Sequence, residues 1–255
     1  MVDCDAVAVG ALIPAYNCAD RLAPVVVGVR AYVPDVLVVD DGSTDDTARV
    51  ALAAGARVVR HARNLGKGPA VRTGLAVVLG EPYSHILMLD ADGQHDPADA
   101  PGFLAAAETA ELVVGNRLWQ KEAIPAKRYW TNFIGTRALR AVTGFPLEDS
   151  QSGYRLVSAP LLRRMRLQGL RYSIDSEILV RASRLHARFA HVPIRVIYEG
   201  AQSYYRPVAD TVQIVLSATR FKLFGSELAQ DPGPEQWRQR APAAQVLRPP
   251  APGAA

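Results

Sequence analysis

Cysteine and long hydrophobic runs are scarce in this 255-residue sequence. Its two cysteines, Cys4 and Cys18, form no CxxC pair and no cysteine–histidine cluster. This pattern argues against a zinc site or a disulfide framework and is typical of a reducing compartment. No uninterrupted apolar run approaches the roughly 20 residues of a membrane span, and the acidic start MVDCDAVAVG has too short an apolar run for a signal peptide. We therefore expect a cytoplasmic protein, with peripheral association at the inner face of the cell membrane left open.

Two glycine-rich nucleotide motifs are also missing. The sequence has neither the GxGxxG pattern of dinucleotide oxidoreductases nor the GxxxxGK[ST] pattern of a P-loop. Its hydrophobic content of 49% and charged content of 21% are those of an ordinary folded protein. Acidic residues outnumber basic ones over 1–116, and the reverse holds over 117–255. Either this is ordinary surface charge, or an acidic half holds a cation while a basic half faces phosphates or an anionic surface.

Apolar runs alternate with helical patterns along the first half of the chain, which predicts an α/β fold. Near-continuous Val, Leu and Ile runs indicate strands that are buried on both faces, hence a mostly parallel sheet with helices on both sides. The predicted strands are 7–13, 36–40, 56–61, 85–90, 112–116 and 190–198. The predicted helices are 19–32, 44–54, 67–80, 97–108, 125–143, 158–167, 174–187 and 207–223. We expect a loop over 144–156, one domain over 1–225, and a Pro/Ala-rich disordered tail over 226–255.

Polar motifs follow each of the first four strands, and in an open parallel sheet these ends meet in one crevice. In DADGQH, Asp90 and Asp92 follow an apolar strand, and Gln94 offers a third oxygen. Hard oxygen donors suit Mg²⁺ or Mn²⁺. The alternative is that Asp92 is a turn residue and Asp96 caps the helix that Pro97 opens; we assign Asp96 to that cap in either case.

Two further motifs suit a nucleotide. Asp40 and Asp41, at the end of the second strand, are placed to accept hydrogen bonds from a base or from ribose hydroxyls, although exposed loop acids are often merely solvated. In NLGKG, Gly66, Lys67 and Gly68 precede a helix, and free backbone N–H groups beside a lysine suit a phosphate.

Each motif is weak by itself, but their order is specific. The series IPAYN, VVDDGSTDDT, NLGKGPAVRTGL, DADGQHDP, GNR and DSQSGYRL, over about 7–200, closely resembles the family-2 inverting glycosyltransferases with the GT-A fold. The motifs GNR, AKRYWTN and DSQSGYRL are most similar to those of polyprenyl-phosphate (dolichyl-phosphate) hexose synthases. The resemblance implies a mixed, mostly parallel GT-A sheet and hexose transfer from GDP-mannose or UDP-glucose to a polyprenyl phosphate. It divides the domain into a nucleotide-sugar half, about 1–116, and an acceptor half, about 117–225.

The expected site residues fall into three groups; Lys67 is placed among them by its own motif, and the others by the resemblance. Those expected around the nucleotide are Pro14, Tyr16, Asp40, Asp41, Lys67 and the segment Asp90, Ala91, Asp92 and Gln94. Those expected to hold Mg²⁺ or Mn²⁺ on the diphosphate are Asp90, Asp92 and Gln94. Those expected to bind the acceptor phosphate are Arg117 and Arg128.

The sequence departs from this family pattern at three places. Cys18 stands where the synthases usually have Glu, and Asn132 replaces a serine near the acceptor phosphate. Glu199 occupies a region that usually carries an Arg, so the diphosphate contact is expected to shift to Arg195 or Arg206.

Other readings stay open. The acceptor is a sugar or lipid hydroxyl in one alternative, and Asp149 is then the expected general base, since a hydroxyl needs deprotonation. A non-catalytic nucleotide-binding module is the other alternative. We expect no nucleic-acid partner. The helix predicted over 207–223 either packs on the core or lies at an anionic membrane surface.

Overall fold

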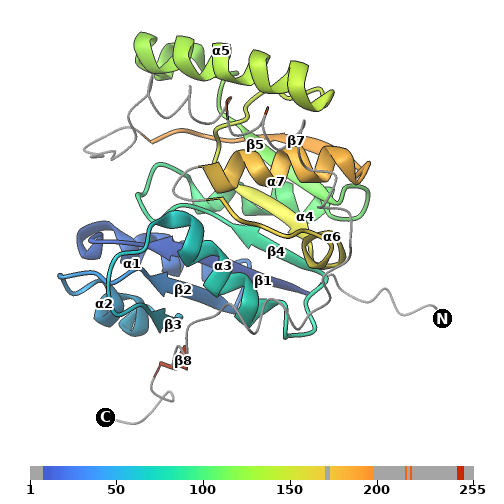
Figure 1. The fold of residues 1–255 in the computed structure, drawn as a ribbon. Coiled ribbons are helices and arrows are strands. Elements are labelled where there is room, and N and C mark those ends of the chain that lie inside the picture. The colour runs from blue at the N-terminus through green and yellow to red at the C-terminus, as the bar shows by residue number, and fades with distance from the viewer. Residues whose placement is uncertain (1–7, 170–172, 198–215, 217–218, 220–245, 250–255) are drawn as a thin grey trace.

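A mixed sheet between two layers of helices positions every motif described above (Figure 1). The computed structural model describes residues 8–169, 173–197, 216, 219 and 246–249. The strands in these ranges are β1 (Val9–Ala15), β2 (Val36–Asp40), β3 (Arg57–Arg60), β4 (His85–Met88), β5 (Leu112–Asn116), β6 (Arg155–Ser158), β7 (Phe189–Pro193) and β8 (Val246–Leu247). The helices are α1 (Ala19–Arg30), α2 (Thr47–Ala53), α3 (Lys67–Val78), α4 (Ala100–Ala106), α5 (Ala126–Thr143), α6 (Ala159–Arg163) and α7 (Ser173–Arg184), with 3₁₀ turns η1 (Pro97–Asp99) and η2 (Lys121–Ala123).

The strand directions bring the motifs to one edge of the sheet. In space the order is β7-β5-β6-β4-β1-β2-β3-β8. β4, β1, β2 and β3 pair in parallel, as do β5 and β7, whereas β6 runs antiparallel to both of its neighbours and β8 antiparallel to β3. The carboxyl ends of β1 to β5 and β7 therefore lie at the edge where β6 begins. Because β6 runs in the opposite direction, the segment that precedes it lies at this edge.

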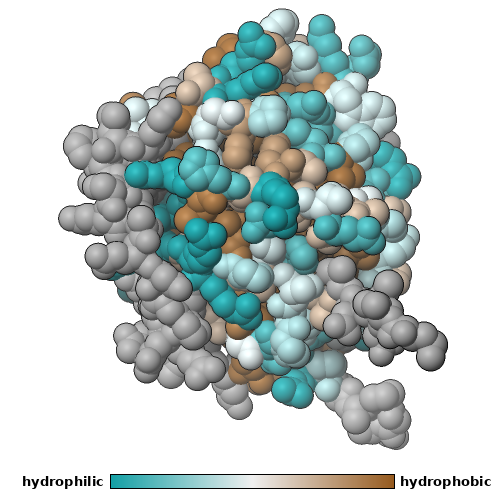
Figure 2. Space-filling view, turned by 90° about the vertical axis from the view of Figure 1, so that its right-hand side faces the viewer, coloured by the Kyte–Doolittle hydropathy of each residue, from teal (hydrophilic) through white to brown (hydrophobic). Residues whose placement is uncertain are grey.

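Two hydrophobic clusters, one on each face, hold the sheet between the helices. Along β1, Leu12 points into the cluster that packs under α3, α6 and α7, while Ala11 and Ile13 point into the cluster under α1 and α4. All three side chains are fully buried, and burial of a large aliphatic side chain such as Leu12 or Ile13 stabilises the fold by roughly 1.5–3 kcal/mol. On the side of the molecule shown in Figure 2, hydrophobic areas are small and separated by hydrophilic ones.

Helix α5 lies along the top of Figure 1, farther from the sheet than the other helices. It follows Pro125 and ends at Gly144, whose φ of 75° is the left-handed conformation that glycine adopts at a helix end. Leu139 anchors its second half in the core beneath. None of the helices in the described ranges is both long and apolar enough to cross a membrane.

Most of the elements predicted from the sequence are present, and the predicted fold class is confirmed. The cap assigned to Asp96 is also confirmed, because its Oδ1 accepts the Ala98 N–H at 2.9 Å. The main correction is β6: a loop was expected over 144–156 and a helix over 158–167, but residues 155–158 form a strand and α6 is only five residues long. A two-residue strand, β8, lies in the segment predicted as a tail. Of the helix predicted over 207–223, all but 216 and 219 lies outside the described residues.

Candidate active site

A cavity of about 550 Å³ opens at the carboxyl edge of the sheet. Its walls come from the segments after β1, β2, β3, β4 and β5, from the segment before β6, and from α3, α5 and α7. The convergence expected from the strand pattern is thus observed. The lining residues that the sequence singled out are Pro14, Tyr16, Asp41, Lys67, Asp90, Ala91, Asp92, Gln94, Arg117 and Arg128.

The two acids after β4 stand in the cavity with unlike electrostatics. Burial raises the pKa of Asp90, but the nearby groups Lys67, His95 and Arg117 together outweigh burial and leave that pKa below its ordinary value. Burial and the adjacent Asp90 carboxylate raise the pKa of Asp92. Asp92 Oδ1 accepts the Gln94 N–H at 3.0 Å across a turn in which Gly93 has a φ of 71°. Asp90, Asp92 and Gln94 all line the cavity.

These side chains could provide part of the oxygen ligands of a hard divalent cation and leave its other positions open. In the part of the chain that the structure describes, no three His, Cys, Asp or Glu side chains are grouped to hold a metal ion. The candidate oxygen donors are the Asp90 and Asp92 carboxylates and the Oε1 atom of Gln94, and all three residues line the cavity. Mg²⁺ and Mn²⁺ accept such incomplete oxygen sets, because water or phosphate fills the remaining positions.

Lys67, the first residue of α3, bridges two acids across the cavity. Its Nζ lies 2.6 Å from Asp90 Oδ1 and 2.8 Å from Asp175 Oδ2. Burial lowers the pKa of Lys67, but the carboxylates of Asp175 and Asp90 outweigh burial and raise that pKa above its ordinary value. The lysine is thus a charged ammonium held by carboxylates, and its contact with a phosphate stays a prediction.

Asp41 fixes the loop in front of α3. Its Oδ1 accepts the Leu65 N–H at 3.0 Å and lies 2.6 Å from His61 Nδ1, while its Oδ2 accepts the Gly66 N–H at 2.6 Å. Asp41 is 3% exposed and lines the cavity, so its carboxylate shapes this part of the cavity wall.

Asp40 and Arg195 lie away from the lining of the cavity. Asp40 is fully buried and pairs with Arg60 at 3.0 Å. Arg195 is paired with Asp96 at 3.1 Å and with Asp99 at 3.3 Å, beside η1. Both residues make their contacts with other protein groups at the margin of the cavity, and their contact with a ligand stays a prediction. Arg206 lies outside the described residues.

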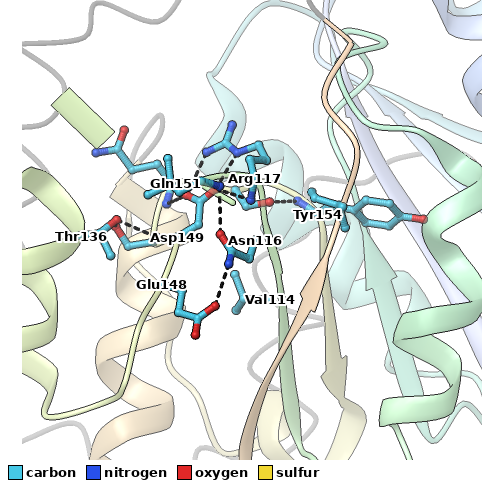
Figure 3. A network of polar contacts seen from close by, with 12 residues as sticks. Val114, Asn116, Arg117, Thr136, Glu148, Asp149, Gln151 and Tyr154 are labelled. Atoms are coloured by element: carbon cyan, nitrogen blue, oxygen red, sulfur yellow. Dashed lines mark hydrogen bonds and ion pairs between the residues drawn. The ribbon is translucent and has the colours of Figure 1, made fainter. Parts of the chain in front are cut away.

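Arg117 and Asp149 form a buried, two-pronged ion pair at the end of β5 (Figure 3). The guanidinium donates from Nε to Oδ2 at 2.7 Å and from Nη2 to Oδ1 at 3.0 Å. The backbone N–H groups of Arg117 and Gln151 also donate to the carboxylate. Burial raises the pKa of Asp149, but Arg117 outweighs burial and holds that pKa below its ordinary value. Asp149 is fully buried, and both of its oxygens are engaged in orienting Arg117.

Helix α5 turns a polar face to the cavity and exposes two large apolar side chains on its opposite face. Arg128 and Asn132, one turn apart, both line the cavity. Arg128 Nη1 lies 3.5 Å from Gln94 Oε1, and the buried Asn132 Oδ1 has no hydrogen-bond partner. On the opposite face, Trp130 is 53% exposed and Ile134 is 62% exposed.

Residues that the sequence did not single out complete the site. Asp175, in the first turn of α7, has the sequence signature of an ordinary acid at a helix start. Gly153 leaves room for Asp90, because a Cβ there would lie 2.1 Å from the Asp90 Oδ2. Arg155, fully buried, donates to the backbone carbonyls of Ser150 and Asp175 and so joins the segment before β6 to α7. In the sequence, Gly153 and Arg155 stand out only as part of the family-like motif DSQSGYRL.

One family of known proteins matches more than half of the chain. Residues 11–166 match the family model described as glycosyl transferase family 2. The chain belongs to this family. It is therefore a glycosyltransferase, as the resemblance predicted, and the alternative of a non-catalytic binding module is set aside.

Two relatives of this family-2 glycosyltransferase are named for the lipid phosphate on which they act. An undecaprenyl-phosphate mannosyltransferase of Micrococcus luteus is 32% identical over 199 residues, which cover 73% of this chain and 82% of that protein. A UDP-N-acetylglucosamine–dolichyl-phosphate N-acetylglucosaminyltransferase of Methanococcus voltae is 30% identical over 215 residues, covering 73% and 84%. Among solved structures, glucosyl-3-phosphoglycerate synthase of Mycobacterium tuberculosis superposes with a TM-score of 0.64 at 22% identity, covering 84% of this chain and 79% of that one. This likeness supports the GT-A fold.

Proposed function

We propose that this glycosyltransferase moves a hexose, with inversion, from a nucleotide sugar to a polyprenyl phosphate. The observation that carries the proposal is that two arginines, Arg117 and Arg128, line the same cavity as the acidic pair Asp90 and Asp92. The acids suit a metal-bound diphosphate, and the arginines suit a second, separate phosphate. The names of the Micrococcus luteus and Methanococcus voltae relatives, which specify undecaprenyl phosphate and dolichyl phosphate, support a lipid phosphate as acceptor.

On the donor side, Asp90, Asp92 and Gln94 would hold Mg²⁺ or Mn²⁺. When bound, the cation supplies positive charge to the nucleoside diphosphate that leaves as the glycosidic bond breaks. One solved structure of the Mycobacterium tuberculosis synthase contains Mn²⁺ and UDP-glucose, which supports a metal role here. The wall that Asp41 shapes, together with Pro14 and Tyr16, would contact the nucleoside. GDP-mannose and UDP-glucose are the donors that we propose to test.

On the acceptor side, a phosphomonoester has its second pKa near 6 and arrives largely ionised at neutral pH. It therefore needs cationic positioning more than it needs a base. Arg117, held rigidly by Asp149, and Arg128, presented by α5, supply that positioning. A hydroxyl acceptor needs a base with an open lone pair. Asp149, with both oxygens occupied by donors, is poorly suited to that role, which favours the phosphate acceptor over the hydroxyl alternative.

The outer face of α5 fits the approach to a membrane-embedded acceptor. Trp130 and Ile134 project away from the cavity, and Trp119, just before η2, is 54% exposed. Lys121 lies over the Trp130 ring, so a positive charge accompanies the aromatic surface. Tryptophan and lysine together are typical of segments that lie at a lipid interface. We therefore include peripheral association with the inner face of an anionic membrane in the proposal.

The decisive experiment changes Arg128 and separates donor binding from transfer. The assay follows radiolabelled sugar from UDP-glucose or GDP-mannose into organic extracts containing a polyprenyl phosphate, with an EDTA arm that should abolish transfer. We expect Arg128→Ala to lower transfer by roughly 10²-fold with donor affinity nearly unchanged, because one charge-stabilising contact is lost. Arg128→Lys should restore only part, since lysine lacks the two-pronged guanidinium.

Arg140→Ala is the matched control, because Arg140 is exposed near the other end of the same helix and lies outside the cavity lining. Its transfer rate should stay within about twofold of the wild type, as for most surface substitutions. If Arg128→Ala weakens donor binding, measured by calorimetry, as much as it weakens transfer, the acceptor-phosphate role is wrong.

A further inference from the structure

The lysine that bridges the cavity is placed where a divalent cation would compete with it. Lys67 Nζ lies 2.6 Å from Asp90 Oδ1, and the Lys67 side chain is only 14% exposed. Asp175 holds the same ammonium from α7 at 2.8 Å, with 13% of its own side chain exposed. Gly153 packs against the other side of the Asp90 carboxylate, so that this carboxylate has little room to turn away.

We propose that Lys67 is an internal counter-ion that keeps the affinity of Asp90 for a divalent cation low until a nucleoside diphosphate enters. The proposal rests on the function proposed above, in which Asp90 is a metal ligand. It adds a role that the family resemblance did not supply, since the sequence predicted only a phosphate contact for Lys67.

The physical argument is competition for one carboxylate. An ammonium at 2.6 Å occupies a lone pair of Asp90 Oδ1 and repels a second cation placed beside it, and this repulsion is strong where burial excludes water. A diphosphate changes the balance because its negative oxygens offer Lys67 another partner. The carboxylate is then released to the metal. Cation and nucleotide should accordingly bind with positive coupling, which is reciprocal by thermodynamic necessity.

The backbone around Lys67 supports this coupling. Gly66, which precedes it, donates its N–H to Asp41, and Asp41 lines the part of the cavity proposed for the nucleoside. The position of Lys67 is thus fixed by the same acid that would sense the nucleotide. Asp175 fixes it from the second half of the chain. A ligand that displaces the Lys67 ammonium therefore acts on both halves of the site.

The test measures Mn²⁺ binding to the 255-residue protein by electron paramagnetic resonance, without nucleotide and without turnover. We expect Lys67→Met to bind Mn²⁺ about tenfold more tightly than the wild type, because removing a nearby positive charge favours a cation. Lys67→Gln should behave alike, and circular dichroism with thermal unfolding verifies that each variant is folded. Lys121→Met, the same change at an exposed lysine outside the cavity lining, should leave the affinity within about twofold.

A second measurement adds UDP or GDP as the probe. In the wild type the diphosphate should raise Mn²⁺ affinity beyond the Mn²⁺–nucleotide affinity measured without protein. In Lys67→Met that gain should shrink by the factor by which the variant already binds Mn²⁺ more tightly. If both Lys67 variants bind Mn²⁺ no more tightly than the wild type, the counter-ion role is wrong. If Asp92→Asn still reduces Mn²⁺ binding in the same experiment, the proposed metal site stands. Absence of Mn²⁺ binding in every variant, with and without nucleotide, overturns the proposed metal site as well.

Discussion

Replacing Asp149 by asparagine should destabilise the protein strongly, because it removes one half of a buried ion pair. Four hydrogen bonds end on this carboxylate, two of them from the guanidinium of Arg117. Asparagine keeps the shape but turns an N–H₂ group toward a cation and leaves Arg117 uncompensated. Removing one partner of a buried pair typically costs about 3–5 kcal/mol. Arg117 is 8% exposed and reaches the cavity, where water screens it, so we expect a loss near the lower end, about 3 kcal/mol.

Urea unfolding followed by circular dichroism measures this loss. With an m-value of about 2–3 kcal/mol/M, the midpoint should fall by roughly 1 M. Asp20→Asn is the matched control, because Asp20 also pairs with an arginine, Arg21, at 2.8 Å but is 67% exposed. Exposed pairs are worth about 1 kcal/mol or less, so this control should scarcely move.

The pH dependence of the same measurement has a definite sign. The folded-state pKa of Asp149 lies below its ordinary value, so this group stabilises the protein above the unfolded pKa of about 3.9. The stabilisation is lost as pH falls through the folded pKa. The gap between wild type and Asp149→Asn should therefore be constant from pH 5 to 8 and narrow only in stronger acid. If Asp149→Asn unfolds at the wild-type urea concentration yet loses all transfer, Asp149 is a catalytic residue and our reasoning is refuted.

Two further predictions concern Gly153 and Cys18. Gly153→Ala should lower transfer by at least about tenfold with little loss of stability, because its Cβ would displace the Asp90 carboxylate; unchanged Mn²⁺ affinity and activity in this variant would contradict the packing. Cys18, whose pKa burial raises to about 11, should react with iodoacetamide at pH 8 roughly a hundredfold more slowly in the native protein than in urea, as followed by mass spectrometry; equal rates would show that the thiol is not buried as described.

The strands that precede the site residues could be predicted from the sequence, because helices cover both faces of the sheet. All five residues of β2 are buried and the first four, VLVV, are apolar; β5 is likewise fully buried and begins with the apolar run LVV. Parallel pairing then dictates that the segments after these strands meet. The convergence of Asp41, Asp92 and Arg117 on one cavity follows from that topology.

β6 was not predictable in the same way. Its four residues, RLVS, begin with a charged side chain, and the next residue already starts α6. Arg155 is fully buried in the structure, satisfied by backbone carbonyls, whereas a sequence pattern treats arginine as a surface residue. That a strand from the second half enters the sheet in the opposite direction depends on packing across the whole chain. No local pattern contains that information.

The sequence also does not indicate which charged side chains form ion pairs with one another. Lys67 and Asp175 are 108 residues apart, and nothing in NLGKG or YSIDSE indicates that they meet. The sequence also pointed to Arg195 and Asp40 as ligand contacts, but each has a nearby residue of opposite charge at the margin of the site. One chain reveals which residues carry charge. Which carboxylate neutralises which cation is a property of the folded molecule.

The antiparallel entry of β6 has a consequence for the synthesis of the chain. In the described residues β5 pairs only with β6 and β7, both of which follow it in sequence, while β4 is the neighbour of β6 on the other side. A nascent chain that ends at residue 116 has already made β5 but has no strand to place it on, and its β4 is an open apolar edge. Such edges invite aggregation. The nucleotide half therefore depends on the acceptor half to close its sheet, and a chaperone that shields this edge during translation would bridge the delay.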